Sequence, residues 1–288
     1  YDVVYTNLQA AGAYRGYGAT QGIFAVESLV NELAQQLNMD PTVLREQNMV
    51  RQGMIMPAYY GEPANACALD RCMAHCKEMF HWEDKYPVRD MGNGKVRSAG
   101  VAMAMQGSCI SNIDVGSARV RLNDDGSFTL MIGAADMGTG CDTILAQMAA
   151  EIMDCRLEDV AVFGADTDAS PYDSGSYASS TTYLTGKAVE QACTELKKNL
   201  FALAGEMLDC PAQELTLENG RIRRLDTQQS VSLEDVAYRS QCGNNIPVEA
   251  SATHSSPISP PPFMVGMVEI ELDRLTGQVT VLDYMAVV

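Results

Sequence analysis

The sequence predicts an α+β fold, in which mixed sheets pack against helices, and three observations support this prediction. Apolar residues recur at helical spacing in several segments, the longest of which extends over more than twenty residues after position 180. Alternating β-branched stretches joined by turn residues predict three antiparallel hairpins. The 288 residues, of which 47% are hydrophobic and 20% charged, are sufficient for two compact domains.

The first region, residues 1–90, is expected to be mainly helical. We predict, in chain order, a short strand at residues 1–6, a glycine-rich loop at 7–20, and three helices at 21–37, 41–53 and 68–80. The second helix has the clearest start, because Asp40 and Pro41 are residue types favoured at the N-cap and at the first helical position. The polar stretch after the third helix contains Pro87 and Gly92, which indicates a domain boundary near residue 90.

The second region, residues 91–288, is expected to alternate strands with helices. The predicted elements follow in chain order: a strand at 100–105, a hairpin at 118–132, a helix at 142–152, a buried strand at 160–163, the long helix at 181–207, and two further hairpins at 217–222 and 266–281. Asp142 is expected to cap the first of these helices. A polar loop at 165–180 precedes the long helix, and a proline-rich linker at 257–262 separates the last two hairpins.

The charge and the cysteine content exclude several classes of function. The 20 Lys and Arg against 37 Asp and Glu give 20 − 37 = −17, which repels nucleic-acid backbones and anionic lipid surfaces. No apolar run approaches the roughly 18 residues that a membrane span requires. Nine scattered cysteines, an odd number, indicate reduced thiols and a cytoplasmic protein. Because the chain starts at Tyr1 without a methionine, we expect a processed chain or a piece of a longer one.

One cysteine cluster has two interpretations. Cys67, Cys72, His75 and Cys76 are metal-ligand residue types that lie close together in the sequence. Their spacing fits neither a plant-type iron–sulfur motif nor a paired zinc site, and Cys72 and Cys76 are one helical turn apart. We therefore favour small buried side chains of a helix core over a metal site.

The first candidate site is a glycine loop that leads into the first long helix and contains Arg15, Gly16, Tyr17 and Gly18. Glycine allows a ligand to approach the backbone closely, and a helix start offers unpaired N–H groups to an anion. The glycine pattern differs from the dinucleotide fingerprint and lacks its β-α-β context, so no nicotinamide site is expected. A tight turn with a solvated Arg15 and a packed Tyr17 is the alternative.

The second candidate site follows Asp136 and consists of Gly138, Thr139 and Gly140. Two glycines around a hydroxyl can surround a phosphate or a polar heterocycle with backbone donors. The Asp142 carboxylate at the helix start would repel an anion, so neutral hydrogen bonds are favoured over direct phosphate binding. A plain glycine turn before the helix is the alternative.

The third candidate site is the hydroxyl-rich segment 174–182, which includes Ser179, Ser180 and Thr181 at the start of the long helix. Small side chains and several hydroxyls at a helix N-terminus can bind an oxyanion or a phosphate. An N-cap role would explain one hydroxyl only, so a ligand is favoured. No G-x-S-x-G motif occurs, and a hydrolase is not expected.

The three sites occur together, in this order, as AYRGYGATQGIFAVE (13–27), GAADMGTGCDTILAQMAAE (133–151) and SYASSTTYLTGKAV (176–189). In this combination they resemble the molybdenum-cofactor subunit of the xanthine dehydrogenase and aldehyde oxidoreductase family. The resemblance covers nearly the whole chain, because DPTVLREQNMVRQG and the closing strand pair GMVEIELDRLTGQVTVLDY are also similar to that family.

The resemblance implies a role for each loop. The first loop would place the main-chain amide of Arg15, next to Gly16, near the molybdenum, with Tyr17 stacked on the substrate ring. The other two loops would hold a molybdopterin dinucleotide, and the backbone of Ala178 would face the metal. The cofactor-binding residues implied in these two loops are Gly138, Thr139, Gly140, Ala178, Ser179, Ser180 and Thr181.

Two departures from the family pattern affect this expectation. Family members usually carry Gln where this chain has Thr139, so this chain lacks the side-chain amide that the resemblance would place in a hydrogen bond to the metal centre. The family's catalytic base, a Glu in a glycine-rich motif, is expected after Val288. This chain is therefore expected to contain no catalytic base and to be inactive in isolation, with iron–sulfur clusters and FAD on other domains or subunits.

The implied function is hydroxylation of a purine or related N-heterocycle, or of an aldehyde, with oxygen derived from water. This chain would contribute the cofactor cradle and the substrate wall, and its partners would be the small-molecule substrate, the remaining part of the molybdenum subunit and the electron-transfer domains. The alternative is a non-catalytic domain for pterin binding or subunit assembly.

Overall fold

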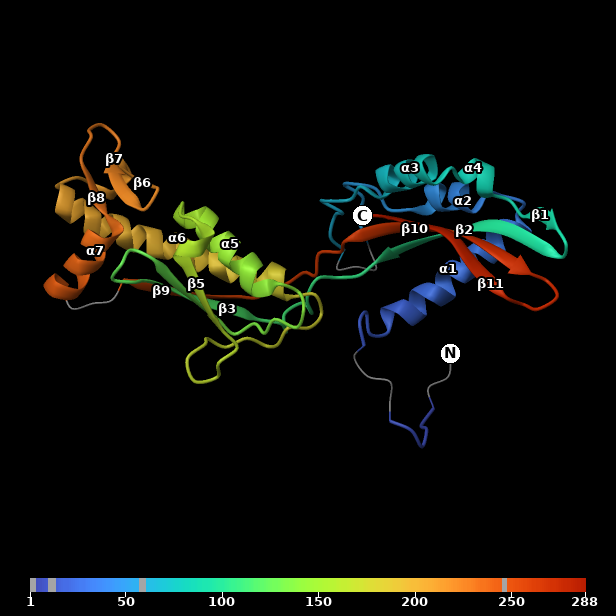
Figure 1. Ribbon diagram of the computed structural model, residues 1–288, viewed down its shortest axis with the longest axis horizontal. Coiled ribbons are helices and arrows are strands. Elements are labelled where there is room, and N and C mark those ends of the chain that lie inside the picture. Colours follow the sequence, from blue (N-terminus) through green and yellow to red (C-terminus); the bar gives the residue numbers. More distant parts are fainter. Residues whose placement is uncertain (1–3, 10–13, 57–60, 245–247) are drawn as a thin grey trace. The chain divides into compact units, whose positions relative to one another are not determined.

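The computed structural model describes residues 4–9, 14–56, 61–244 and 248–288. The expected strand at 1–6 falls partly outside these residues, as does the loop at 7–20. The chain divides into two compact units, of which unit 1 comprises Tyr1–Gln106 with Pro261–Val288 and unit 2 comprises Gly107–Pro260. Figure 1 shows the elements of both units.

This division differs from the expected boundary at residue 90. The segment after residue 90 continues unit 1, because its strands pair with the C-terminal hairpin. The four-stranded sheet of unit 1 has the order β1-β2-β10-β11, with every pair antiparallel; its strands are Arg89–Gly92, Lys95–Met105, Phe263–Asp273 and Val279–Val287. The proline-rich linker therefore returns the chain from unit 2 to unit 1.

The helices of unit 1 are α1 to α4, with bounds Ala19–Gln36, Pro41–Asn48, Leu69–Phe80 and Trp82–Lys85. Helix α2 starts as predicted, with the Asp40 side chain accepting from the amide of Thr42 at 2.7 Å, but it ends at Asn48 rather than Gly53. The short helix α4 and strand β1 were not expected, because four-residue elements leave little periodicity in a sequence.

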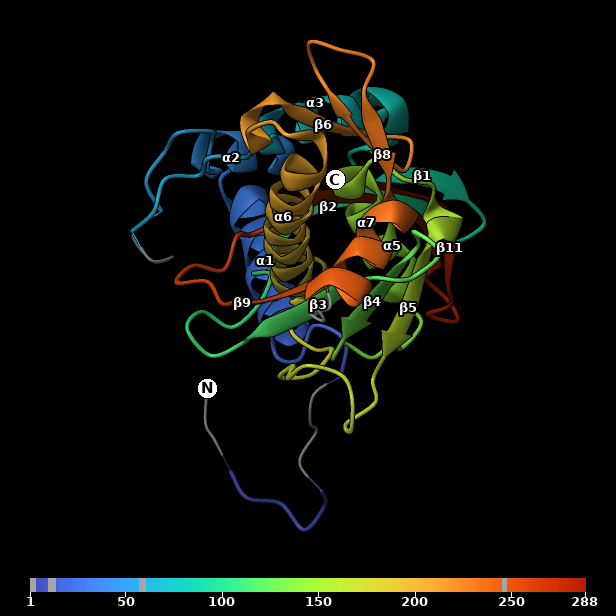
Figure 2. The ribbon, with the colours of Figure 1, turned by 90° about the vertical axis from the view of Figure 1, so that its left-hand side faces the viewer.

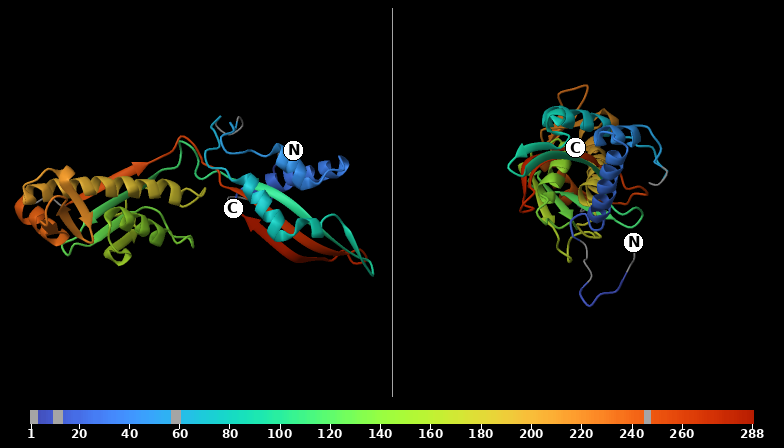
Figure 3. Two further views of the ribbon diagram at one scale, coloured as in Figure 1. Left: turned by 90° about the horizontal axis from the view of Figure 1, so that it is seen from above. Right: turned by 90° about the vertical axis from the view of Figure 1, so that its right-hand side faces the viewer.

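The core of unit 1 lies between α3 and the sheet. It includes Cys72, Cys76, Phe80, Trp82 and residues of β2 and β10 such as Val101, Val265 and Met267. Cys67 is buried in the same cluster and His75 is exposed, so the cysteines of this segment serve as small core side chains. Helix α1 runs alongside β2, as the left-hand view of Figure 3 shows.

Unit 2 is built on a second sheet, with the order β5-β4-β3-β9. Its strands β3, β4, β5 and β9 are Gly116–Leu122, Phe128–Ile132, Val160–Gly164 and Glu249–His254. Strands β3 and β4 form the predicted hairpin, and β5 lies parallel to β4. A parallel neighbour requires a crossover, which helix α5 (Cys141–Met153) provides.

One face of this sheet is covered by α5 and by the long helix α6 (Thr181–Leu208), as Figure 2 shows. Apolar side chains of both helices, among them Leu145, Ala149, Val189 and Leu196, form one core with side chains of β3 and β4 such as Val120 and Leu130. The strand expected to be buried, β5, is instead an edge strand in which only Val160 is buried. An edge strand pairs with only one other strand and is less covered, so the apolar run of β5 did not indicate a buried strand.

The remaining elements of unit 2 are a small sheet, helix α7 and three short turns. A small antiparallel sheet has the order β6-β7-β8 and contains the predicted turn at Asn219 and Gly220. Strands β6 to β8 and helix α7 are Leu215–Glu218, Arg221–Arg224, Ser230–Ser232 and Leu233–Arg239, and the single turns η1 to η3 are Leu157–Asp159, Ala212–Glu214 and Ser240–Asn244. None of the helices in the described part of the chain is long and apolar enough to cross a membrane.

Candidate functional site

The second and third candidate loops meet at one end of unit 2. Ile132 ends β4, and the loop that follows it leads to α5, while segment 174–180 leads to α6. The Ala135 amide donates a hydrogen bond to the Ser176 hydroxyl at 2.9 Å, which joins the two loops directly. At Gly133 a Cβ atom would lie 2.4 Å from the Pro171 carbonyl oxygen, so this close approach requires glycine.

Asp136 organises the second loop. Its Oδ1 accepts hydrogen bonds from the amides of Gly138, Thr139 and Gly140 at 2.8, 3.0 and 3.1 Å. These hydrogen bonds, of which the one from Gly138 has the largest effect, lower the pKa of Asp136 below its ordinary value. The structure therefore corrects the expected cap: Asp142 lies within the first turn of α5, and the N-cap position is Gly140 in the left-handed region.

The Asp136 hydrogen bonds decide what the second loop can bind. The three amides that were candidate donors for a ligand already donate to a carboxylate, and Asp136 and Asp142 are both exposed. Two carboxylates repel a phosphate, whereas they accept hydrogen bonds from the N–H groups of a neutral heterocycle. Among the described residues, Asp136, Cys141 and Asp142 place potential metal ligands within 4.8 Å of one another, without any further indication of an ion.

The third loop, unlike the second, offers hydrogen-bond donors that suit an anion. Ser180 occupies the N-cap position of the 28-residue helix α6, but its side chain makes no capping hydrogen bond. The Ser180 hydroxyl instead donates to the Tyr177 carbonyl at 2.7 Å and is buried. The Ser180 side chain therefore does not cap the start of α6. On either side of it, Ser179 is exposed and Thr181 is half-buried. An anion fits such a position, because amide dipoles and hydroxyls point their positive ends toward it.

The turn before α6 has an unusual backbone. Ala178 and Ser179 have φ angles of 52° and 56°, in the left-handed region that residues with a Cβ rarely adopt. Ala178 is buried, and its carbonyl accepts from the Cys109 amide at 2.8 Å. Nothing in the sequence around Ala178 marks this conformation, because left-handed turns usually carry Gly or Asn.

The first loop lies in unit 1 and is described by itself. It is a tight turn in which the Tyr17 amide donates to the Tyr14 carbonyl at 2.6 Å and the Ala19 amide to the Gly16 carbonyl at 2.8 Å. Gly16 and Gly18 have φ angles of 80° and 90°, which glycine adopts without strain. Arg15 is exposed and Tyr17 is 40% exposed, so the tight turn still leaves the tyrosine ring accessible.

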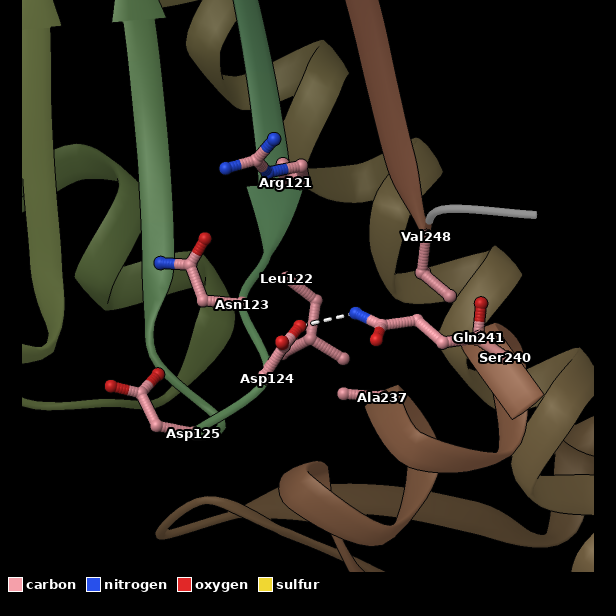
Figure 4. A pocket seen from close by; sticks show the side chains of 9 residues that line it. All are labelled: Arg121, Leu122, Asn123, Asp124, Asp125, Ala237, Ser240, Gln241 and Val248. Carbon is pink, nitrogen blue, oxygen red and sulfur yellow. Dashed lines mark hydrogen bonds between the residues drawn. The ribbon is translucent and has the colours of Figure 1, made fainter. Parts of the chain in front are cut away.

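A pocket of about 800 Å³ lies elsewhere in unit 2 (Figure 4). Its lining includes Arg121 of β3, Asn123 and Asp124 of the β3–β4 turn, and Gln241, whose side-chain amide donates to Asp124. The candidate loops lie at the other end of β3, a strand of seven residues and roughly 20 Å. The pocket therefore does not belong to the site that the two loops form.

Comparison with known proteins agrees with a cofactor-binding assignment. Residues 75–288 match a family model described as molybdopterin cofactor-binding domain, and residues 1–49 match a second model with the same description. The chain therefore belongs to the molybdopterin cofactor-binding domains of the xanthine dehydrogenase and aldehyde oxidoreductase family.

Two curated relatives and one solved structure illustrate the similarity. The putative xanthine dehydrogenase molybdenum-binding subunit of Escherichia coli K12 is 34% identical over 289 residues, which cover 96% of this chain and 38% of that protein. The probable hypoxanthine oxidase of the same organism is 32% identical over 287 residues, which cover 96% of this chain and 30% of that protein. The CO dehydrogenase of Oligotropha carboxidovorans superposes with a TM-score of 0.82 at 21% identity, covering 96% of this chain and 37% of that chain.

The coverages and identities determine what this chain shares with these proteins. The chain spans about a third of the length of the curated relatives that it matches. The similarity to the solved structure, at 21% identity, shows the fold alone. The family assignment covers both sequence regions that carry the candidate loops.

Proposed function

We propose that this chain forms the cofactor cradle and part of the substrate wall of a molybdenum hydroxylase. The observation that carries this proposal is the junction of loops 133–140 and 174–180 at the start of α5 and α6, within a molybdopterin cofactor-binding domain. One loop is anionic and rich in acceptors, and the other combines a helix start with hydroxyl donors. The pair suits a ligand that has both a neutral heterocycle and phosphates.

In this proposal, different residues of the two loops bind different parts of a molybdopterin dinucleotide. Ser179, Thr181 and the first turn of α6 would bind its anionic groups. The loop of Gly138, Thr139 and Gly140 would lie along the neutral pterin, where space is open, because a Cβ on either glycine would meet no described residue within 4 Å. Ser180 would act through the loop backbone, since its hydroxyl already donates to Tyr177.

The roles proposed for the metal fall on main-chain groups. They are assigned separately, one to the amide of Arg15, beside Gly16, and one to the backbone of Ala178. When bound, the cofactor supplies the two-electron redox chemistry that amino-acid side chains lack. The protein residues position the substrate and limit the access of water.

The substrate class proposed is a purine or a related N-heterocycle, with an aldehyde as the second candidate. Tyr17 is 40% exposed on a hydrogen-bonded turn, and an accessible phenol ring favours a planar aromatic substrate through stacking. Two relatives above 30% identity carry names that refer to xanthine and hypoxanthine. Both observations support the heterocycle.

The remaining parts of the enzyme belong to the proposal as well. Because the relatives are about three times longer than this chain, we propose that further segments supply the catalytic base, iron–sulfur clusters and FAD. The nine cysteines are free among the described residues, which agrees with a cytoplasmic protein.

A substrate panel tests this function. The complete, partner-bound enzyme would be assayed with xanthine, hypoxanthine, nicotinate and an aliphatic aldehyde, using an artificial electron acceptor and water labelled with ¹⁸O. We expect turnover of at least one ring substrate, with the label in the product. Bound pterin without turnover of any substrate would favour the alternative, a non-catalytic binding or assembly domain.

A further inference from the structure

Asp114 is a fully buried carboxylate to which the proposed function assigns no role. It lies just before β3 and is 0% exposed. Its Oδ1 accepts from the Tyr177 hydroxyl at 2.7 Å, and its Oδ2 accepts from the Ile110 amide at 2.7 Å. A buried carboxylate is costly unless its oxygens receive hydrogen bonds, so both donors stabilise this side chain strongly.

The segment that contains Asp114 holds the third loop at further points. The Cys109 amide donates to the Ala178 carbonyl at 2.8 Å. At the other end of the segment, the Val115 amide donates to the Ser174 hydroxyl at 3.1 Å, and the Ser174 amide donates to the Val115 carbonyl at 3.2 Å. Residues 109–115 therefore contact the loop both before and after Tyr177.

These contacts act on a backbone that is unfavourable by itself. Cys109, Ala178 and Ser179 have φ angles of 87°, 52° and 56°, and a left-handed conformation costs a residue with a Cβ free energy. Two of these three residues are joined by the Cys109–Ala178 hydrogen bond. Such conformations persist where surrounding contacts determine them, and here the buried Asp114 connects the two strained turns through Tyr177 and Ile110.

We propose that Asp114 is a positioning residue for the cofactor site. By binding the Tyr177 hydroxyl and the Ile110 amide, it fixes the left-handed turn at Ala178 and Ser179, and thereby the main chain and the Ser179 hydroxyl that face the cofactor. This role rests on the proposed function, because it assigns the turn to the molybdopterin dinucleotide.

The test compares Tyr177→Phe and Asp114→Asn with matched controls in the complete enzyme. Tyr177→Phe removes the hydroxyl that donates to Asp114 and keeps the ring. The controls are Tyr172→Phe and Asp168→Asn, which change exposed residues of the preceding loop. Hydrogen exchange would be followed at the amides of Cys109 and Ser180, which donate to the Ala178 and Tyr177 carbonyls. The rate of molybdenum loss after dilution would be measured in parallel.

We expect both variants to speed exchange at these two amides at least tenfold and molybdenum loss at least threefold, with both controls unchanged. The line shape of the Mo(V) electron paramagnetic resonance signal should also change at equal molybdenum content, whereas a loss of stability alone would lower only its intensity. Should Asp114→Asn fail to fold, Tyr177→Phe decides the question alone.

Two different failures can be told apart. Exchange and molybdenum loss at the wild-type rate in Tyr177→Phe would overturn the role of Asp114 and leave the proposed function intact. A wild-type enzyme that contains no molybdenum would overturn the proposed function and, with it, the cofactor role of the turn. Exchange at the two amides would then show whether Asp114 still holds the backbone.

Discussion

Arg45 and Glu27 form a buried ion pair in which the Nη2–Oε2 distance is 2.7 Å and the side chains are 1% and 14% exposed. The same Glu27 carboxylate accepts from the Met103 amide at 2.8 Å, at a position of β2 that has no strand partner on that side within the described part of the chain. One carboxylate therefore connects α1 with α2 and with the open edge of β2. The first candidate loop leads directly into α1, the helix that carries Glu27.

The ion pair predicts a large effect of Glu27→Gln on stability. Removal of one partner leaves the Arg45 charge buried and uncompensated, which costs about 3 kcal/mol in the free energy of unfolding. Urea unfolding followed by the fluorescence of Trp82, the only tryptophan and a residue of the same unit, would measure this change. Asp70→Asn, which breaks the exposed pair with Arg51, should change it by less than about 1 kcal/mol. Equal effects of the two variants would contradict the account.

Asp40 predicts a loss of stability in acid. Burial would raise its pKa, but hydrogen bonds from Thr42 and from the Trp82 indole outweigh burial and lower the pKa below the ordinary value of 3.8. A carboxyl with a lowered folded-state pKa stabilises the fold above the unfolded-state pKa, and this contribution disappears as the pH falls through the folded-state value.

The measurement is the free energy of unfolding between neutral pH and pH 3. The wild type should lose more stability than Asp40→Asn as the pH falls below about 4. Parallel curves for the two proteins over this interval would show that Asp40 does not carry the linkage. Lys85 and Asp283 form a separate ion pair of this unit, and Asp283→Asn would serve as a comparison.

Much of the fold was predictable because it follows from local patterns. The apolar periodicity identified α1, α3 and α6 to within about two residues, and turn residues identified three hairpins. The division into units was not predictable, because the pairing of β2 with β10 joins residues about 170 positions apart. Local sequence carries no signal for such a contact.

The candidate site was predictable in part. The three loops have a recognisable composition, and the structure brings the second and third together through Ala135 and Ser176. The roles of individual polar residues were less accessible. The role of Asp136 had a local signal, because an Asp before two glycines is a pattern that permits a capped turn. The role of Asp114 had no such signal, because its partner Tyr177 lies about 60 positions away. The cofactor and substrate roles of the loop residues remain predictions.

Ser179 and Thr181 predict how the cofactor is retained. Each hydroxyl that donates to a charged oxygen contributes about 1.5 to 3 kcal/mol, so the double variant Ser179→Ala/Thr181→Ala should lose most of its molybdenum during dilution. Its circular dichroism spectrum should match that of the wild type, which would show that the fold is intact. Ser180 is left unchanged because its hydroxyl supports the loop. Thr167→Ala, in the exposed part of the preceding loop, should retain the metal. Full retention by the double variant would show that these hydroxyls do not bind the cofactor.

Tyr17 predicts the preference for ring substrates. Tyr17→Ala should lower kcat/KM for a heterocycle by about one to two orders of magnitude, because stacking both stabilises and orients the ring. Tyr14→Ala changes another exposed tyrosine of the same turn and should have little effect. Steady-state kinetics with several rings and one aliphatic aldehyde would measure the difference. An unchanged kcat/KM for every ring would remove Tyr17 from the substrate wall.

The most direct test of the central claim is the metal and pterin content of the complete protein, purified in its native assembly from cells that load related enzymes. The account predicts molybdenum and pterin nucleotide in equimolar amounts, both reduced in Ser179→Ala/Thr181→Ala and unchanged in Thr167→Ala. A folded and fully assembled protein that contains neither molybdenum nor pterin would contradict the claim that loops 133–140 and 174–180 form a cofactor cradle.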